Sequence, residues 1–106
     1  MNQSFTSHQF TDEAGNPAGG HSYGTGFSVA WQNGPLNRGE DRVDPNGAFV
    51  ETIISVAADR LEFYQSSKFV SDYNAGALEH LYEALKILNA RTADRESRDV
   101  EGTHAV

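Results

Sequence analysis

Residues 73–97 read YNAGALEHLYEALKILNARTADRES, with leucine at positions 78, 81, 85 and 88. Intervals of three and four place these side chains on one face of an α-helix, as in helices that pack against another helix. The next members of this stripe are Thr92 and Arg95, so it turns polar within one continuous helix. We therefore predict a long helix over residues 73–97 that packs along its leucine face.

An earlier helix is predicted over residues 47–65, where apolar side chains recur at helical spacing. Ser66-Ser67-Lys68 interrupts this pattern, and Ser71 or Asp72 offers an N-cap oxygen for the second helix. So short a connection predicts an antiparallel helical hairpin. The first helix has one predicted packing face and a second apolar group beside it, which favours burial in a symmetric homo-oligomer. The face comprises Val50, Ile53, Ala57 and Leu61, and the second group Phe49, Val56 and Phe63.

The pattern of the N-terminal sequence predicts a small antiparallel β-sheet region. Alternation between Thr25 and Gln32 indicates a half-buried strand with Phe27, Val29 and Trp31 on one face, and Asn33-Gly34-Pro35 ends it. A second short strand near Leu36 or Val43 is a fainter prediction. Residues 1–21 are rich in glycine and polar side chains, which predicts a flexible or loosely held arm, with a strand anchored by Phe5 and Phe10 as the alternative.

The fold class predicted is thus α+β: a long antiparallel α-helical hairpin with a small N-terminal antiparallel β part, in a symmetric homo-oligomer. A chain of 106 residues is expected to form one domain. Its predicted parts are the arm (1–21), the β part (22–46), the hairpin (47–98) and a C-terminal motif (99–106).

Composition limits the functions that this chain can have. The net charge of −7 disfavours binding to nucleic-acid backbones, and the lack of cysteine excludes disulfides and thiolate metal sites. No apolar run approaches the roughly 20 residues needed to cross a bilayer, and no leader segment is evident. We expect a soluble, unexported protein without a membrane partner.

Three of the eight basic residues, Arg91, Arg95 and Arg98, project from one side of the last turns of the second helix. Guanidinium groups suit phosphate oxygens, which would make this end an anion site. Cations at a helix C-terminus also complement the helix dipole and pair with nearby carboxylates. Spacing alone leaves both interpretations open and favours the second.

Other candidate residues lie around the interhelical connection. Asn74 can donate and accept hydrogen bonds to a base or ribose, or serve in the first turn of the helix. Tyr64 and Tyr73 can stack on a base, or belong to the core. The four histidines show no ligand spacing, and no nucleophile with a base or carboxylate pair is evident, so neither a metal site, a cofactor nor an enzymatic activity is expected.

Several blocks in order resemble the helical-hairpin family of bacteriophage anti-defence proteins, which includes Thoeris anti-defence and anti-CBASS branches. The β-containing N-terminal part is similar to the Thoeris branch. The resemblance covers about residues 24–104, and its most specific part is the adjacent pair of motifs RTADR and VEGTH. The blocks are Leu61-Glu62-Phe63-Tyr64-Gln65, Asn74-Ala75-Gly76-Ala77-Leu78, Glu83-Ala84-Leu85, Ala90-Arg91-Thr92-Ala93-Asp94-Arg95 and Val100-Glu101-Gly102-Thr103-His104.

The resemblance implies a sponge in the cytoplasm of an infected bacterium: a protein that binds a cyclic nucleotide messenger of host immunity without cleaving it. The ligand implied is a glycosylic cyclic ADP-ribose isomer, with cyclic di- or trinucleotides at a separate site in some members. Alternatives are a structural or adaptor homo-oligomer, for which the arginines are only helix-end charges, and an enzyme that degrades the messenger.

By position, the resemblance assigns Tyr64 to stacking on adenine, Asn74 to polar recognition and Arg91 to the pyrophosphate. Asn74 and Arg91 are 17 positions apart on one helix, or about 25 Å, so we expect a pocket shared by two subunits of a homodimer or hexamer. Two departures concern the pocket: Asp72 replaces a frequently basic residue, and Asp99 replaces a glycine at the helix stop. The predicted ligand-binding residues are Tyr64, Asn74, Arg91, Thr92, Arg95, Arg98, Gly102, Thr103 and His104.

Overall fold

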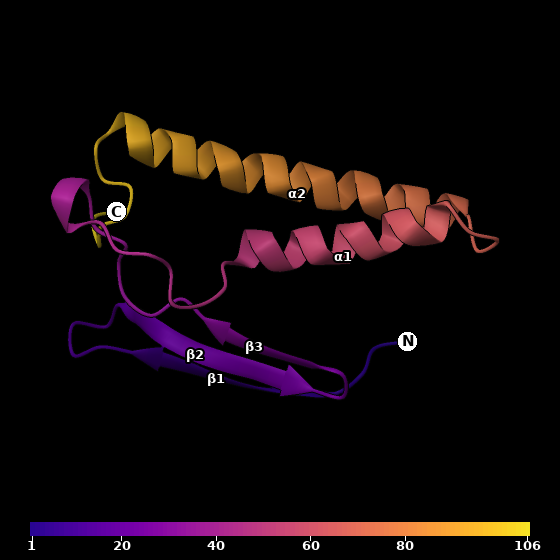
Figure 1. Cartoon of the computed structure of the whole chain (residues 1–106), viewed down its shortest axis with the longest axis horizontal. Helices are drawn as coiled ribbons and strands as arrows, with labels where there is room; N and C mark the ends of the chain where they lie inside the picture. The colour runs from indigo at the N-terminus through magenta and orange to yellow at the C-terminus, as the bar shows by residue number, and fades with distance from the viewer. The chain divides into compact units, whose positions relative to one another are not determined.

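The computed structural model of the protein describes residues 1–106, and their contacts divide them into two compact units. One unit consists of Met1–Phe49 together with Val100–Val106, and the other of Val50–Asp99. In Figure 1 the first contains the three strands, the following loop and the C-terminus, and the second contains both long helices. The predicted C-terminal motif thus belongs to the same unit as the sheet.

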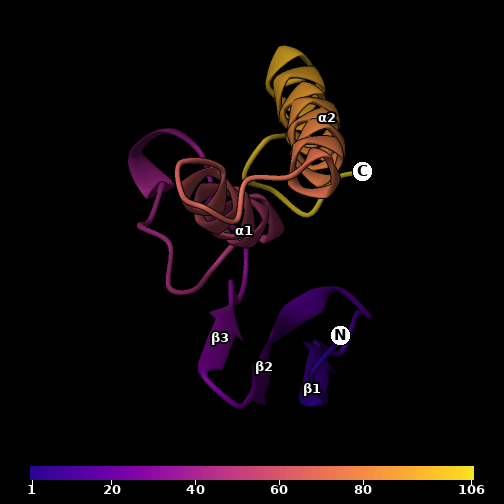
Figure 2. The same ribbon diagram turned by 90° about the vertical axis from the view of Figure 1, so that its right-hand side faces the viewer.

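The sheet has three antiparallel strands in the order β1-β2-β3. The strands are β1 (Phe5–Thr11), β2 (Pro17–Gly24) and β3 (Phe27–Trp31), and Figure 2 shows them side by side. The predicted strand over 25–32 is confirmed as β3. The prediction of a flexible arm over residues 1–21 is wrong for most of that segment, because β1 and much of β2 lie there; the alternative of a strand containing Phe5 and Phe10 is correct.

Polar and small side chains hold these first strands together, which explains why their hydrophobicity gave little signal. The buried Ser22 hydroxyl lies 2.7 Å from the Ser7 hydroxyl and accepts a 3.0 Å hydrogen bond from Trp31 Nε1. One side chain of β2 thereby links β1 to β3. Burial of a hydroxyl requires such partners, and here two neighbouring strands supply them.

Asp12 closes the turn between β1 and β2. Its Oδ1 accepts hydrogen bonds from the backbone N–H groups of Ala14 and Asn16, both at 2.9 Å. Gly15 follows with a φ of 84°, a conformation that glycine adopts without strain. The hydrogen bonds from Asn16, and that from Ala14, lower the pKa of the Asp12 carboxyl below its ordinary value of 3.8.

Acid is therefore expected to loosen this turn. Because the folded-state pKa of Asp12 is depressed, its contribution to stability is complete above the unfolded value of 3.8 and is lost as pH falls through the folded value. Amide hydrogen exchange at Ala14 and Asn16 should accelerate over that range relative to the intrinsic rate. In Asp12→Asn the same amides should show no such acid transition; a transition that persists there would contradict the assignment.

The segment between β3 and the first helix contains a short 3₁₀ helix, Gly39–Asp41, and no strand near Leu36 or Val43. The strand expected near Leu36 or Val43 is therefore wrong: a single bond from Val43 N–H to Leu36 O closes a loop there instead. Ala48 forms an isolated bridge with Trp31. This bridge keeps residue 48 extended, which explains why the first helix begins later than the predicted residue 47.

The second unit is the predicted helical hairpin, formed by α1 (Val50–Gln65) and α2 (Asp72–Ser97). The N-cap is confirmed, because Ser71 Oγ accepts a 3.1 Å hydrogen bond from the backbone N–H of Asn74. The packing stripe of α2 is confirmed as well, since Leu78 is 6% exposed and its successors are half-buried. These successors are Leu81, Leu85, Leu88, Thr92 and Arg95.

The packing face of α1 differs from the prediction. It is centred on Ala58, which is 3% exposed, with Ile54 and Leu61 half-buried beside it. Of the four residues predicted on this face, Ile53 and Leu61 are half-buried, whereas Val50 and Ala57 are exposed. The small Ala58 side chain allows close approach of the helices, and this favours a face rotated from the one that apolar spacing suggested.

Apolar residues of α1 outside this face remain uncovered, as expected. Val56 is 61% and Phe63 is 52% exposed, and Val50 at the start of the helix is 52% exposed. A polar contact also joins the helices: Tyr82 OH donates a 2.7 Å hydrogen bond to Glu62 Oε1, which raises the pKa of the Tyr82 phenol.

Candidate functional site

A pocket of about 380 Å³ lies at the tip of the hairpin, where α1 passes into α2. Its lining residues are Tyr64 near the end of α1, Phe69 and Ser71 in the connection, and Asn74 in the first turn of α2. We call it the tip pocket. Two of the predicted site residues, Tyr64 and Asn74, therefore lie together within one chain. The two aromatic rings, together with the polar side chains of Ser71 and Asn74, suit a planar, partly polar ligand.

Gln65 fixes the orientation of the amide that faces this pocket. Its Oε1 accepts from the Ser71 backbone N–H at 3.0 Å, and its Nε2 donates to the Ser71 carbonyl at 3.1 Å. Because a backbone N–H can only donate and a carbonyl can only accept, the Gln65 amide has one possible orientation. Asn74 Nδ2 then donates to Gln65 Oε1 and to the Phe69 carbonyl, each at 3.0 Å.

Both N–H groups of the Asn74 amide are therefore used inside the protein. Its Oδ1 has no hydrogen-bond partner within the chain, and Asn74 lines the tip pocket. Asn74 accordingly presents an acceptor, and a matching ligand must offer a donor such as an exocyclic amine or a hydroxyl. Asn74 can serve both in the first turn of the helix and in ligand recognition, because the first role uses its backbone N–H and its Nδ2 and the second would use its Oδ1.

The residues around Asn74 that hold it in place were not predicted from the sequence. Phe69 and Ser71 lie in the connection, where only the capping role of Ser71 had a recognisable signal. Gln65 had none, since its bonds depend on the path of the chain between the helices. Asp72, the acidic residue expected to alter the pocket, lies in the first turn of α2, where a carboxylate interacts favourably with the helix dipole.

The arginines at the other end of α2 differ in their surroundings. Arg98 pairs with Asp94 at 3.1 Å, in agreement with the helix-end interpretation for this residue. Arg91 is exposed and has no hydrogen-bond or ion-pair partner. Arg95 is half-buried in the stripe, and Thr92 Oγ1 lies 3.4 Å from the Leu88 carbonyl. Arg91 is the member of the cluster whose guanidinium is available to an anion.

The tip pocket and Arg91 do not meet within the hairpin. They belong to opposite ends of α2, and the 17 positions between Asn74 and Arg91 correspond to about 25 Å. The expected left-handed helix stop at Asp99 is confirmed by its φ of 58°. A residue with a side chain is less stable than glycine in this conformation.

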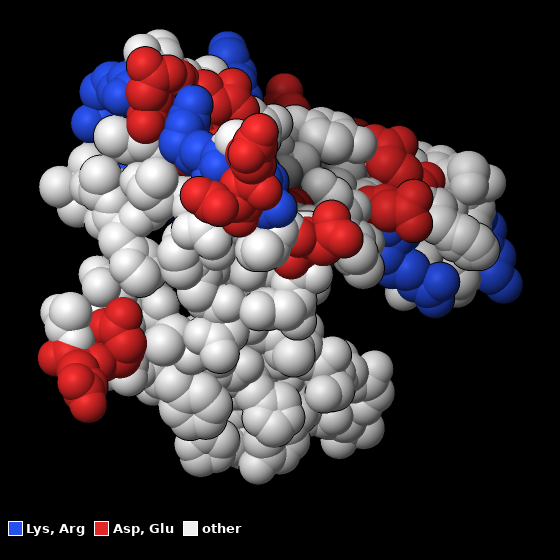
Figure 3. Space-filling model, turned by 60° about the vertical axis from the view of Figure 1, so that its left-hand side comes forward, with Lys and Arg blue, Asp and Glu red and all other residues white.

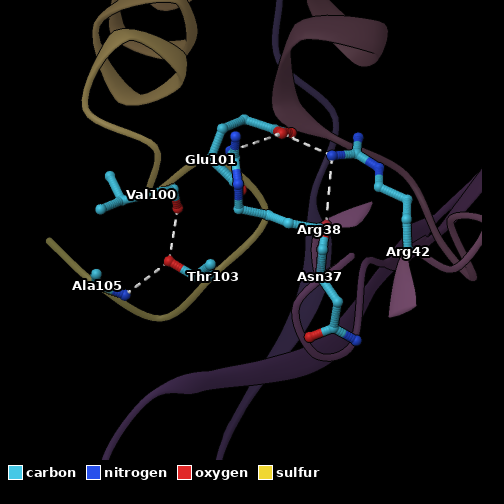
Figure 4. Close-up of polar contacts among 7 residues, drawn as sticks. All are labelled: Asn37, Arg38, Arg42, Val100, Glu101, Thr103 and Ala105. Carbon is cyan, nitrogen blue, oxygen red and sulfur yellow. Dashed lines mark hydrogen bonds and ion pairs between the residues drawn. The ribbon is translucent and has the colours of Figure 1, made fainter. Parts of the chain in front are cut away.

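The remaining predicted residues, Gly102, Thr103 and His104, belong to the sheet-containing unit, where His104 is exposed. Residues 100–103 form a clasp with residues 37–42, part of which Figure 4 shows. Arg42 Nη1 lies 2.6 Å from Glu101 Oε2, and Arg38 Nη1 donates to the Glu101 carbonyl at 3.0 Å. The Asn37 N–H donates to the Gly102 carbonyl, and Thr103 Oγ1 donates to the Val100 carbonyl. The motif has structural contacts here, and its role toward a ligand stays a prediction.

Alanine at Gly102 is expected to open this clasp. Gly102 has a φ of 78°, and an added Cβ would lie 2.5 Å from the Asn37 carbonyl oxygen. The strain of about 1–3 kcal/mol should accelerate hydrogen exchange of the Asn37 amide. Gly34→Ala is the matched control, because Gly34 has a φ of 83° with nothing within 4 Å of its added Cβ. Equal exchange at Asn37 in both variants would rule out the steric contact as the cause.

Comparison with known proteins places the chain among phage proteins. No family model matches it. It is 43% identical over 77 residues to Thoeris anti-defense 1 of Bacillus phage SBSphiJ7, and the match covers 73% of this chain and 51% of that protein. The chain thus spans about half the length of this relative. Neither helix is both long and apolar enough to cross a membrane. The matched region bears out the resemblance in the sequence: over 77 residues this chain is similar to a member of the Thoeris anti-defence family.

Proposed function

We propose that this protein counters the Thoeris defence of a bacterial host by binding a cyclic nucleotide messenger and holding it without cleavage. The observation that carries the proposal is the tip pocket, which combines two aromatic rings with one oriented amide oxygen. Similarity to a member of the Thoeris anti-defence family supports the biological setting. The match covers 51% of the relative. That this chain shares the activity of the whole relative is therefore part of the proposal.

A purine nucleotide suits the tip pocket chemically. Tyr64 or Phe69 can stack on the base, which contributes about 1–3 kcal/mol per base in comparable sites. Asn74 Oδ1 can accept a hydrogen bond from the exocyclic amine of adenine or from a ribose hydroxyl. A base that offers only acceptors at this point would leave Asn74 Oδ1 unsatisfied and bind less well. The preferred ligand in this proposal is a glycosylic cyclic ADP-ribose isomer.

The proposed complete site uses two chains. Arg91 has no partner of its own and lies far from the tip pocket of the same helix. In an antiparallel pair of hairpins, Arg91 of one chain would approach the tip pocket of the other and bind the pyrophosphate. The uncovered apolar area of α1, including Val56 and Phe63, provides a reason for self-association into a homodimer or hexamer.

Capture followed by release tests the proposal. The pure protein is incubated with a panel of cyclic ADP-ribose isomers and cyclic di- and trinucleotides, freed of unbound ligand by ultrafiltration, and then heated. Chromatographic recovery of an unaltered nucleotide supports sequestration. Failure to retain any member of the panel would refute it, and the appearance of linear nucleotide or ADP-ribose would identify an enzyme. Native mass spectrometry of the same samples gives the number of subunits and bound ligands.

A further inference from the structure

Both rings of the tip pocket have a basic side chain over them. The guanidinium carbon of Arg60 lies 4.9 Å from the centre of the Tyr64 ring, and Arg60 Nε lies 3.3 Å from the Tyr64 hydroxyl. Lys68 Nζ lies 5.4 Å from the centre of the Phe69 ring. A cation within about 6 Å of a ring centre is attracted by the ring, so both groups are held beside the pocket. Sequence analysis singled out neither residue.

Neither cation is neutralised by a carboxylate. Arg60 and Lys68 form no ion pair, and the terminal nitrogens of Arg60 have no hydrogen-bond partner. Arg42 and Arg98, by contrast, pair with Glu101 and Asp94 respectively. In a protein of net charge −7, two cations without an ion pair thus lie beside one pocket. Figure 3 shows basic atoms at one end of the hairpin, with acidic atoms next to them.

Arg60 and Lys68 lie at the same end of the hairpin as the tip pocket, whereas Arg91 lies near the far end of α2. Arg60 precedes Tyr64 by one turn of α1, and Lys68 precedes Phe69 in the connection. An arginine stacked on a ring keeps the donors of its outer edge available for phosphate oxygens. A lysine supplies a second, more mobile charge.

We propose that Arg60 and Lys68 bind the phosphate groups of the nucleotide whose base enters the tip pocket, so that one chain supplies base stacking, amide recognition and anion binding. This inference rests on the proposed function. It assigns the tip pocket a preference for phosphorylated ligands over the corresponding nucleosides. In this arrangement Arg60 and Lys68 of one chain already bind the phosphate groups, and Arg91 of a second chain supplies an additional cation.

Calorimetric titration with a glycosylic cyclic ADP-ribose isomer, at two salt concentrations, tests this assignment. Arg60→Gln and Lys68→Gln are each expected to raise Kd about tenfold, as for loss of one charge-assisted contact. Lys86→Gln is the matched control, because Lys86 is an exposed lysine of α2 without an ion-pair partner. The two tip variants should also reduce the salt dependence of Kd, which a change in packing alone would not do.

The outcomes separate this inference from the function on which it rests. If Arg60→Gln and Lys68→Gln bind the nucleotide as Lys86→Gln does, the assignment is wrong and sequestration stands. If the wild-type protein and Lys86→Gln bind nothing, the proposed function fails first. Arg60→Lys should restore most of the affinity by keeping the charge. Thermal melting checks folding, and should Arg60→Gln melt early, Lys68→Gln decides the question, since the Lys68 ammonium makes no hydrogen bond or ion pair within the chain.

Discussion

Leu78→Ala is expected to lower the free energy of unfolding of the hairpin by about 2–4 kcal/mol, as truncation of a buried leucine removes apolar contacts and leaves a cavity. Leu78 is 6% exposed, and together with Ala58 at 3% it forms the buried centre of the α1 and α2 pair. A unit with so few buried side chains has little other apolar burial with which to compensate. Urea denaturation followed by helical circular dichroism measures the loss.

Ile87→Ala provides the control on the same helix. Ile87 is 60% exposed, so its truncation should change the free energy of unfolding by less than about 0.5 kcal/mol. Both variants remove aliphatic carbon from α2 and differ mainly in burial. A larger loss for Ile87→Ala than for Leu78→Ala would contradict the packing face described for α2.

Arg91→Ala is expected to weaken nucleotide binding by about 10- to 100-fold while leaving the oligomeric size unchanged, because it removes a charge-assisted contact to the ligand and none within the chain. Arg98→Ala is the matched control, since Arg98 lies at the same helix end and pairs with Asp94. Titration calorimetry and size-exclusion chromatography measure the two properties. Loss of assembly with unchanged affinity would instead favour the adaptor function.

Mixing two defective variants tests whether Arg91 acts on the pocket of a second chain. Tyr64→Ala removes a ring of the tip pocket, and Arg91→Ala removes the distant cation. In a heterodimer of these variants, one site carries both defects, but the other combines an intact tip pocket with an intact Arg91. Co-expression should therefore recover up to one high-affinity site per heterodimer. No recovery in verified heterodimers would show that the two residues do not cooperate between chains.

Much of the helical unit was predictable because its determinants are local. The leucine spacing, the Ser71 cap and the breaks after Gln65 and Ser97 act between residues within one or two turns. The tip pocket was predicted only in part. Tyr64 and Asn74 were named from the resemblance, but the bonds that orient Asn74 depend on how the connection brings Gln65 beside Ser71. The Arg60 and Tyr64 pair has helical spacing and was detectable in principle.

The sequence by itself determined the helical hairpin, the strand Phe27–Trp31 and the resemblance to an anti-defence family, because helix periodicity, strand alternation and ordered motifs can be recognised along the chain. Only the tertiary structure decided the pairing of β1 with β2 and the clasp of Glu101 with Arg38 and Arg42. It also decided which face of α1 packs and which atom of the Asn74 amide has no partner within the chain. These features depend on polar partners and close approaches between segments that fold together, and such partners leave no periodic pattern in the sequence.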